Sequence, residues 1–201
     1  NGLLILAVMM LAAGIVALYS SSAILADKEC GDPLFYVKRQ VMFGGLGLAG
    51  LMFLSRVPYQ RLREWVWPAL FATAVVLVAV LFGPKIGGAR RWIKIGGFGL
   101  QPAEFAKLTV VLFLADYLDR KRSRLDNPVQ GIAVPWAVVG TLLVLIGLEP
   151  DLGTPSLIFA VTVLTLFVGG ARLNMLAWSL AASAPVVVWQ LWAYPYRRAR
   201  V

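Results

Sequence analysis

The chain has 201 residues, of which 60% are hydrophobic and 14% charged, and its mean hydropathy is +0.78. Because a soluble domain carries about 25% charged residues, this composition excludes an ordinary soluble domain and predicts an integral membrane protein. The net charge of +9 would suggest nucleic-acid binding in a soluble protein. Here the basic residues stand in short segments between apolar stretches, where they fit orientation signals and headgroup contacts, so no nucleic-acid partner is expected.

The apolar residues fall into seven stretches, each close to the roughly 20 residues that a helix needs to cross the hydrocarbon core. These stretches are 3–25, 36–54, 65–83, 101–118, 132–148, 152–169 and 174–193. Backbone groups in lipid must be paired within helices or closed barrels, and the stretches are too continuous for alternating barrel strands of about 10 residues. The predicted fold class is therefore all-α, a polytopic transmembrane helix bundle that forms one domain over residues 1–201.

The available side chains limit the chemistry. The chain has no histidine and one cysteine, Cys30, so an intrachain disulfide is excluded and the usual general base is missing. Any reaction must rest on Asp, Glu, Lys and Arg side chains.

Alternating spans would divide the connecting segments between the two sides of the membrane. One side receives 55–64, 119–131 and 170–173, and the other receives 26–35, 84–100, 149–151 and the tail. The total count of basic residues does not decide the orientation, but the dense run at 120–124 favours the first side as cytoplasmic. The basic residues of 84–100 then lie outside, against the usual bias, and binding of an anionic ligand is one reason for such an exception.

The segment 87–97 places two arginines and a lysine among glycines. The guanidinium groups of Arg90 and Arg91 match phosphate oxygens in bidentate fashion, with Lys94 as a third cation, and Trp92 suits the headgroup layer. The segment therefore fits a pocket for the phosphates of a lipid-linked substrate. The alternative, an interfacial loop that touches ordinary anionic headgroups, remains open.

The segment from Gln101 to Lys107 predicts the start of a helix. Pro102 suits the first turn, Glu104 falls in that turn, where the helix dipole favours it, and Lys107 follows at a spacing of three that allows an ion pair. Charged residues at the mouth of a membrane helix are functional candidates. The alternative is a helix cap with a lysine that extends to the interface.

The turn from Glu149 to Thr154 places two carboxylates, those of Glu149 and Asp151, between two apolar stretches. Asp151 fits an N-cap. Alternation places this turn on the same side as 84–100, where its carboxylates could orient a sugar hydroxyl, pair with Lys107 or Arg90, or help to hold a divalent cation beside phosphates.

These motifs resemble those of the SEDS family (shape, elongation, division and sporulation). The resemblance rests on Gly88–Ile93, Gln101–Lys107 and Pro150–Thr154, and it spans the whole chain. Gly31–Pro33 and the tail at 196–200 favour the FtsW-like branch over RodA. Ala103 stands where the family usually has serine, and Glu149 where it usually has glutamine.

The resemblance implies a glycosyltransferase that polymerises peptidoglycan from lipid II in the bacterial inner membrane, with its active site facing outside. It implies a class B penicillin-binding protein as partner, along with other divisome or elongasome membrane proteins. No cofactor is certain, and a divalent cation is left open. The residues expected to act in catalysis are Glu104, Lys107 and Asp151. Those expected to bind substrate are Arg90, Arg91, Trp92, Lys94, Gln101 and Glu149.

The resemblance also implies about ten helices, with a large outer loop after Val201 that carries the aspartate proposed as general base. A chain of these residues alone is therefore expected to be inactive. Two other functions remain as alternatives: a flippase or transporter for the same lipid, and a non-catalytic scaffold for the transpeptidase.

Overall fold

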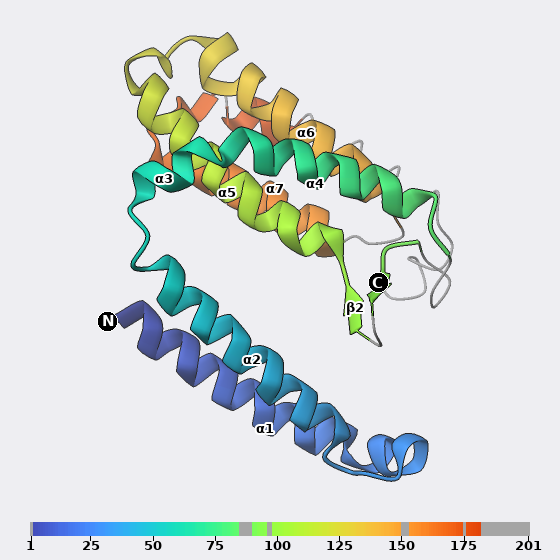
Figure 1. Ribbon diagram of the computed structural model, residues 1–201. Coiled ribbons are helices and arrows are strands. Elements are labelled where there is room, and N and C mark those ends of the chain that lie inside the picture. The colour runs from blue at the N-terminus through green and yellow to red at the C-terminus, as the bar shows by residue number, and fades with distance from the viewer. Residues whose placement is uncertain (1, 85–89, 96–97, 150–152, 175, 182–201) are drawn as a thin grey trace. The chain divides into compact units, whose positions relative to one another are not determined.

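The computed structural model describes residues 2–84, 90–95, 98–149, 153–174 and 176–181. It consists of helices joined by short segments, with one small hairpin (Figure 1). The α-helices are α1 (Gly2–Cys30), α2 (Phe35–Leu54), α3 (Tyr59–Glu64), α4 (Val66–Leu81), α5 (Pro102–Lys121), α6 (Val134–Gly147) and α7 (Gly153–Val168). A 3-10 helix, η1 (Arg122–Arg124), and a π-helical turn, η2 (Val129–Ala133), stand between α5 and α6. The chain forms two compact units, Asn1–Tyr59 and Gln60–Val201.

The first unit is a pair of helices, α1 and α2, that pack against each other. Gly31, with φ of +68°, ends α1 in the left-handed conformation that glycine tolerates. Gly44 allows a close approach of the two helices, because a Cβ atom there would lie 2.8 Å from Leu11 Cδ1. Most apolar side chains of the pair are exposed, as expected for helices whose surroundings are lipid or other membrane helices.

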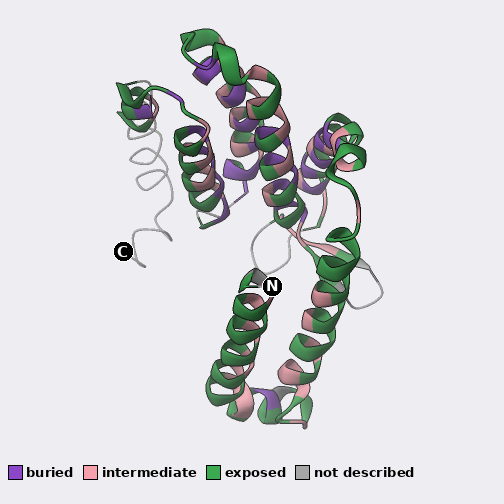
Figure 2. Ribbon diagram, turned by 90° about the vertical axis from the view of Figure 1, so that its left-hand side faces the viewer, coloured by how far each residue is buried: buried purple, intermediate pink, exposed green. Residues whose placement is uncertain are grey.

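The second unit is a bundle of α4, α5, α6 and α7 in which α5 packs against the other three. Its buried residues lie on the sides of the helices that face one another (Figure 2). Phe113 of α5 is 1% exposed and contacts two rings, that of Trp67 at 5.7 Å and that of Tyr117 at 5.6 Å between centroids. The rest of this core is aliphatic and includes Leu77, Val110, Leu114, Val139, Ile146, Ile158 and Leu166.

The prediction of a helical membrane bundle is confirmed, but the number of spans remains a prediction. Among the described residues, two helical segments are both long and apolar enough to cross a membrane, Leu4–Lys28 and Val129–Gly147. Helices α4 and α7 are apolar but have 16 residues each. Most of the expected span 174–193 lies outside the described residues.

Four connecting segments contain more regular structure than expected, and one of them is 55–64, which contains α3. Helix α1 continues to Cys30 instead of ending near residue 25, and the segment 119–131 contains η1 and most of η2. The segment 84–100 forms the strands β1 (Ile93–Ile95) and β2 (Phe98–Leu100), which pair antiparallel with Lys94 opposite Gly99. Two consecutive glycines between short alternating segments are a hairpin signal, so the sequence contained the information for this hairpin.

Candidate functional site

The candidate site residues that the structure describes lie at one end of the second unit. Successive helices of this unit run in opposite directions (Figure 1), so the end of α4, the start of α5, the end of α6 and the start of α7 lie at the same end of the bundle. The hairpin precedes α5 at this end. The described parts of the three segments singled out in the sequence therefore lie at the same end of this unit, as alternation of the helices predicts.

The start of α5 presents an ion pair. Gln101 is the extended N-cap residue with φ of −106° and ψ of 116°, and Pro102 occupies the first turn, where its missing N–H costs nothing. Lys107 Nζ lies 2.7 Å from Glu104 Oε2, and the two side chains are 29% and 56% exposed. The predicted pairing of Glu104 with Lys107 is confirmed.

The opposite side of the same turns is apolar and buried. Pro102, Ala103 and Ala106 are buried against the core, which fixes the side of α5 on which Glu104 and Lys107 must lie. Ala103 is 0% exposed, so the position at which the resemblance expects serine contributes packing here. The ion pair is thus held on a rigid element, which is what a site that positions a ligand requires.

The arginines ahead of the hairpin differ in their surroundings. Arg90 is exposed, and its Nη1 donates a hydrogen bond of 3.0 Å to the carbonyl oxygen of Leu81, the last residue of α4. A cation at the C-terminus of a helix is favoured by the helix dipole, and this contact uses one of five N–H donors. Arg91 is half-buried, and within the described part of the chain its buried Nε has no hydrogen-bond partner.

The hairpin positions the remaining residues of this segment. Trp92 is half-buried and its ring lies against Gly99, where a Cβ atom would come within 3.1 Å of Trp92 Cε3. Lys94, in β1, is exposed. The glycine therefore leaves room for the indole beside the second strand, and the exposed Lys94 is the partner of this glycine in the first strand.

The second carboxylate segment is described in part. Glu149 follows α6 and is 1% exposed, and Thr154 in the first turn of α7 is 8% exposed. Asp151 lies outside the described residues. Glu149 is thus enclosed by protein, unlike Glu104, which is open to its surroundings.

The described residues hold no group of three or more acidic, cysteine or histidine side chains placed to bind a metal ion. The idea of a divalent cation held by carboxylates therefore gains no support from this part of the chain.

A contact at the far end of α5 was not predicted from the sequence: Asp116 accepts hydrogen bonds from Arg63 and Arg120. Its i, i+4 spacing to Arg120 was visible in the sequence, whereas its contact with Arg63 had no local signal.

Comparison with known proteins gives a consistent result. The model of the family of FtsW, RodA and SpoVE, described as "Cell cycle protein", matches residues 1–201. A probable peptidoglycan glycosyltransferase FtsW of Trichlorobacter lovleyi is 37% identical over 99% of this chain and 53% of its own length. Stage V sporulation protein E of Bacillus subtilis is 34% identical over 85% of this chain and 48% of its own. The preference for the FtsW-like branch agrees with these names.

Two solved structures share the fold. The rod shape determining protein RodA of Thermus thermophilus has a TM-score of 0.64 at 30% identity, with 89% of this chain and 57% of RodA covered. A chain from a peptidoglycan synthase complex that coordinates polymerization and crosslinking has a TM-score of 0.66 at 29% identity, with 96% and 57% covered. The chain spans about half the length of the curated relatives it matches.

Proposed function

Because the chain belongs to the FtsW, RodA and SpoVE family of membrane proteins, we propose that this protein is a peptidoglycan glycosyltransferase that polymerises lipid II. The names of its relatives support this activity. The observation that carries the site assignment is the Glu104–Lys107 ion pair, which stands on a rigid helix at the same end of the bundle as Arg90 and Arg91. The substrate carries both phosphates and sugar hydroxyl groups. The arginines can bind the phosphates, and the carboxylate of Glu104 can accept hydrogen bonds from the hydroxyl groups.

The reaction forms a bond between an acceptor sugar oxygen and the anomeric carbon of the donor, and it breaks the bond between that carbon and the diphosphate. The acceptor proton passes to a base, and the undecaprenyl diphosphate leaves with the bonding electrons. Arg90 and Arg91, with Lys94 beside them, hold the diphosphate and stabilise the negative charge that develops on it. Trp92 covers the adjoining lipid or sugar.

The start of α5 and the Glu149–Asp151 turn serve the acceptor side in this proposal. Glu104, Lys107 and Gln101 position the acceptor hydroxyl groups, with Glu104 in the first turn of α5, at the positive end of the helix dipole. Asp151 supports this network. Because Glu149 is enclosed by protein, we assign it a positioning role behind the site instead of direct contact with sugar.

The same relatives support a proposal about the cellular setting. We propose that the protein works in the bacterial inner membrane with this site facing outside, together with a class B penicillin-binding protein and other divisome or elongasome proteins. The similarity to a chain of a peptidoglycan synthase complex that polymerises and crosslinks supports a transpeptidase partner.

The test is polymerisation of lipid II by the full-length protein purified with its transpeptidase. We expect Arg91→Ala and Glu104→Ala each to lower the polymerisation rate about 100-fold, the usual effect of removing one charge-stabilising group. Arg172→Gln, which removes an exposed side chain paired with Asp126, serves as the matched control and should retain full activity. Full activity in both site variants would disprove the site assignment.

A charge-swapped variant separates function from structure. Glu104→Lys combined with Lys107→Glu restores an ion pair of the same spacing. If the pair acts on substrate, the swapped protein should be as inactive as either single variant, whereas its unfolding temperature should equal that of the parent. Recovery of activity would show that the pair only stabilises α5. Lipid flipping that depends on Glu104, with no polymer formed, would instead establish a transporter.

A further inference from the structure

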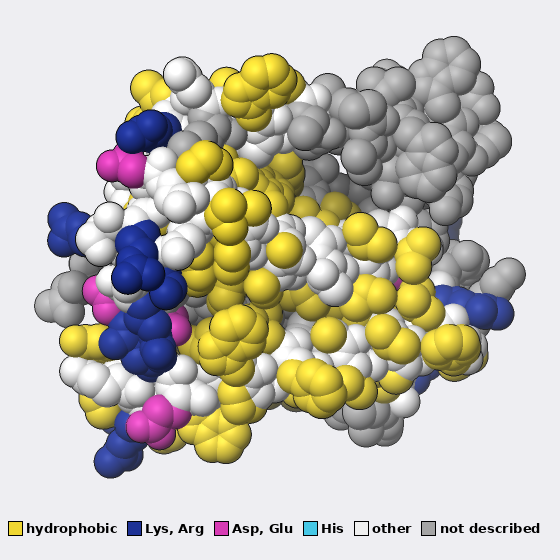
Figure 3. All heavy atoms as spheres, turned by 90° about the horizontal axis from the view of Figure 1, so that it is seen from above, with side chains coloured by type: hydrophobic (Ala, Val, Ile, Leu, Met, Phe, Trp, Pro, Cys, Tyr) yellow, Lys and Arg dark blue, Asp and Glu magenta, His cyan; other side chains and the backbone are white. Residues whose placement is uncertain are grey.

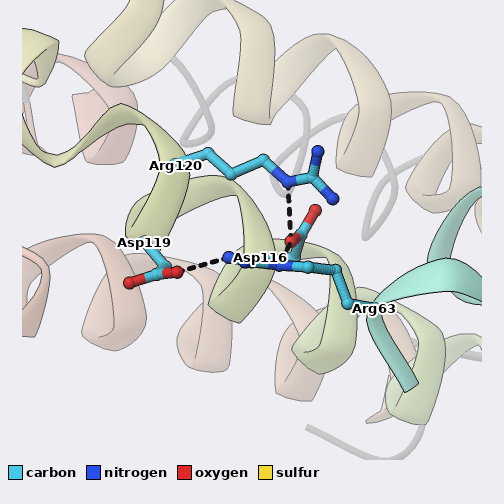
Figure 4. Close-up of polar contacts among 4 residues, drawn as sticks. All are labelled: Arg63, Asp116, Asp119 and Arg120. Atoms are coloured by element: carbon cyan, nitrogen blue, oxygen red, sulfur yellow. Dashed lines mark hydrogen bonds and ion pairs between the residues drawn. The ribbon is translucent and has the colours of Figure 1, made fainter. Parts of the chain in front are cut away.

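The end of the second unit opposite the candidate site carries a closed set of ion pairs. Arg63 of α3 donates through Nε to Asp116 and through Nη2 to Asp119. Arg120 Nε donates to the same oxygen of Asp116 at 2.8 Å (Figure 4). Two arginines thus balance two carboxylates. Because Asp116 is 8% exposed, these contacts fix α3 firmly against α5.

Besides these two arginines and Arg172, which pairs with Asp126, this end carries four further cations. They are Arg61, Lys121, Arg122 and Arg124, called here the free basic group. None of the four forms an ion pair within the described residues, and all but the half-buried Lys121 are exposed.

The free basic group leaves this end with an excess of positive charge. Asp126 pairs with Arg172 at 3.0 Å, so Glu64 is the one carboxylate of residues 60–64 and 116–126 outside the ion pairs. Four cations less one carboxylate leave three positive charges. Figure 3 shows Lys and Arg side chains gathered at the side where α3 lies, next to a largely apolar surface. Such an excess of positive charge attracts anionic binding partners.

The surroundings of the free basic group match the headgroup layer of a bilayer. The polar helix α3 ends at Glu64, and the apolar helix α4 begins at Val66. Trp65 and Trp67, at this boundary, are 68% and 58% exposed. Amphipathic tryptophan rings concentrate at the level of the headgroups, so the free cations stand at the depth of lipid phosphates.

We propose that the free basic group binds the phosphate-bearing headgroups of anionic phospholipids in the adjoining leaflet. Arginine forks match phosphate oxygens, and each basic residue near an anionic surface strengthens binding about fivefold. The ion-pair set holds Arg61 of α3 beside the cations that follow α5. This surface is separate from the proposed polymerase site, because Lys121 and Glu104 stand about 25 Å apart along α5 at 1.5 Å per residue.

The experiment uses delipidated full-length protein in a neutral detergent, titrated with phosphatidylglycerol, phosphatidylcholine or inorganic phosphate and analysed by native mass spectrometry. The parent should bind phosphatidylglycerol at least tenfold more tightly than phosphatidylcholine. Replacing all four cations of the free basic group by glutamine should remove this preference. The matched control, Asp126→Asn with Arg172→Gln, removes a nearby ion pair that has no net charge. This variant should keep the preference for phosphatidylglycerol.

Several outcomes would overturn the proposal. They are equal binding of the two lipids by the parent, undiminished phosphatidylglycerol binding by the fourfold variant, and binding of inorganic phosphate as tight as that of the lipid. Binding of an acidic peptide such as polyglutamate with no preference for phosphatidylglycerol would point to a protein partner instead. If the fourfold glutamine variant does not fold, the single variants Arg61→Gln and Arg124→Gln should each weaken phosphatidylglycerol binding about fivefold, and unchanged binding in both would overturn the proposal. Raising the salt concentration from about 50 to about 500 mM should weaken the binding of phosphatidylglycerol by the parent protein. Binding that does not depend on salt would contradict its electrostatic basis.

Discussion

Replacing Gly131 by alanine should disrupt the segment that leads from α5 to α6. Gly131 is buried in η2, and a Cβ atom there would lie 2.2 Å from the backbone carbonyl oxygen of Leu125. The carbonyl belongs to a residue that is 3% exposed. On the other side, Gln130 is held by a hydrogen bond of 2.8 Å from the Tyr117 hydroxyl to its carbonyl oxygen. Neither side can therefore yield without loss of packing.

The cost can be assembled from the contacts. Overpacking of a buried position costs about 1–3 kcal/mol. The backbone must also move, which breaks the hydrogen bond of 2.7 Å from Gly131 N to the Asn127 carbonyl, worth about 1 kcal/mol. Alanine recovers about 0.5–1 kcal/mol relative to glycine through its smaller loss of chain entropy. The net destabilisation should be about 1–3.5 kcal/mol.

A second glycine provides the control. Gly140 lies in the interior of α6, and a Cβ atom there would meet nothing within 4 Å, so Gly140→Ala should stabilise the protein by about 0.5–1 kcal/mol. Reversible unfolding of the full-length protein in mixed micelles, followed by circular dichroism, gives both values. The effects of the two substitutions on the free energy of unfolding should differ by about 3 kcal/mol, which adds the destabilisation at Gly131 to the stabilisation at Gly140. Equal unfolding midpoints would refute the argument from the Leu125 carbonyl.

Two other predictions concern charged contacts. In the ion-pair set, Arg63→Gln should lower the unfolding midpoint more than Arg120→Gln, because Arg63 contacts two carboxylates and is less exposed, at 31% against 53%; the reverse order in the same assay would contradict this. In the turn after α1, Lys38 Nζ and the Leu34 N–H both donate to Asp32 and hold the pKa of that carboxyl below its usual value. The contribution of Asp32 to stability should therefore be complete above about pH 3.9 and be lost as the pH falls through the lower folded pKa. A carbon-13 NMR titration of labelled aspartate should give a midpoint below that of a model peptide, and Lys38→Gln should raise it; an unchanged midpoint would exclude the ion pair as the cause.

The helices of this protein were largely readable from the sequence. The apolar stretch 36–54 became α2, which differs by one residue at its start, and the stretch 152–169 became α7 with a difference of one residue at each end. The start of α5 at Pro102 followed from its turn chemistry. The Glu104–Lys107 pair was equally local, since residues three apart on a helix are neighbours whatever the rest of the chain does.

Only the packing of the helices decided the rest. Arg63 and Asp116 are 53 residues apart, so no local pattern could pair them. The burial of Glu149 and the contact between Gly131 and the Leu125 carbonyl also depend on how the segments around α6 fold onto their neighbours. The positions of the helices and the charges that stand within one turn can be read along the chain, because lipid solvation and the helix period set them. The tertiary structure decided which charges are neutralised across helices and which remain free to meet a phosphate.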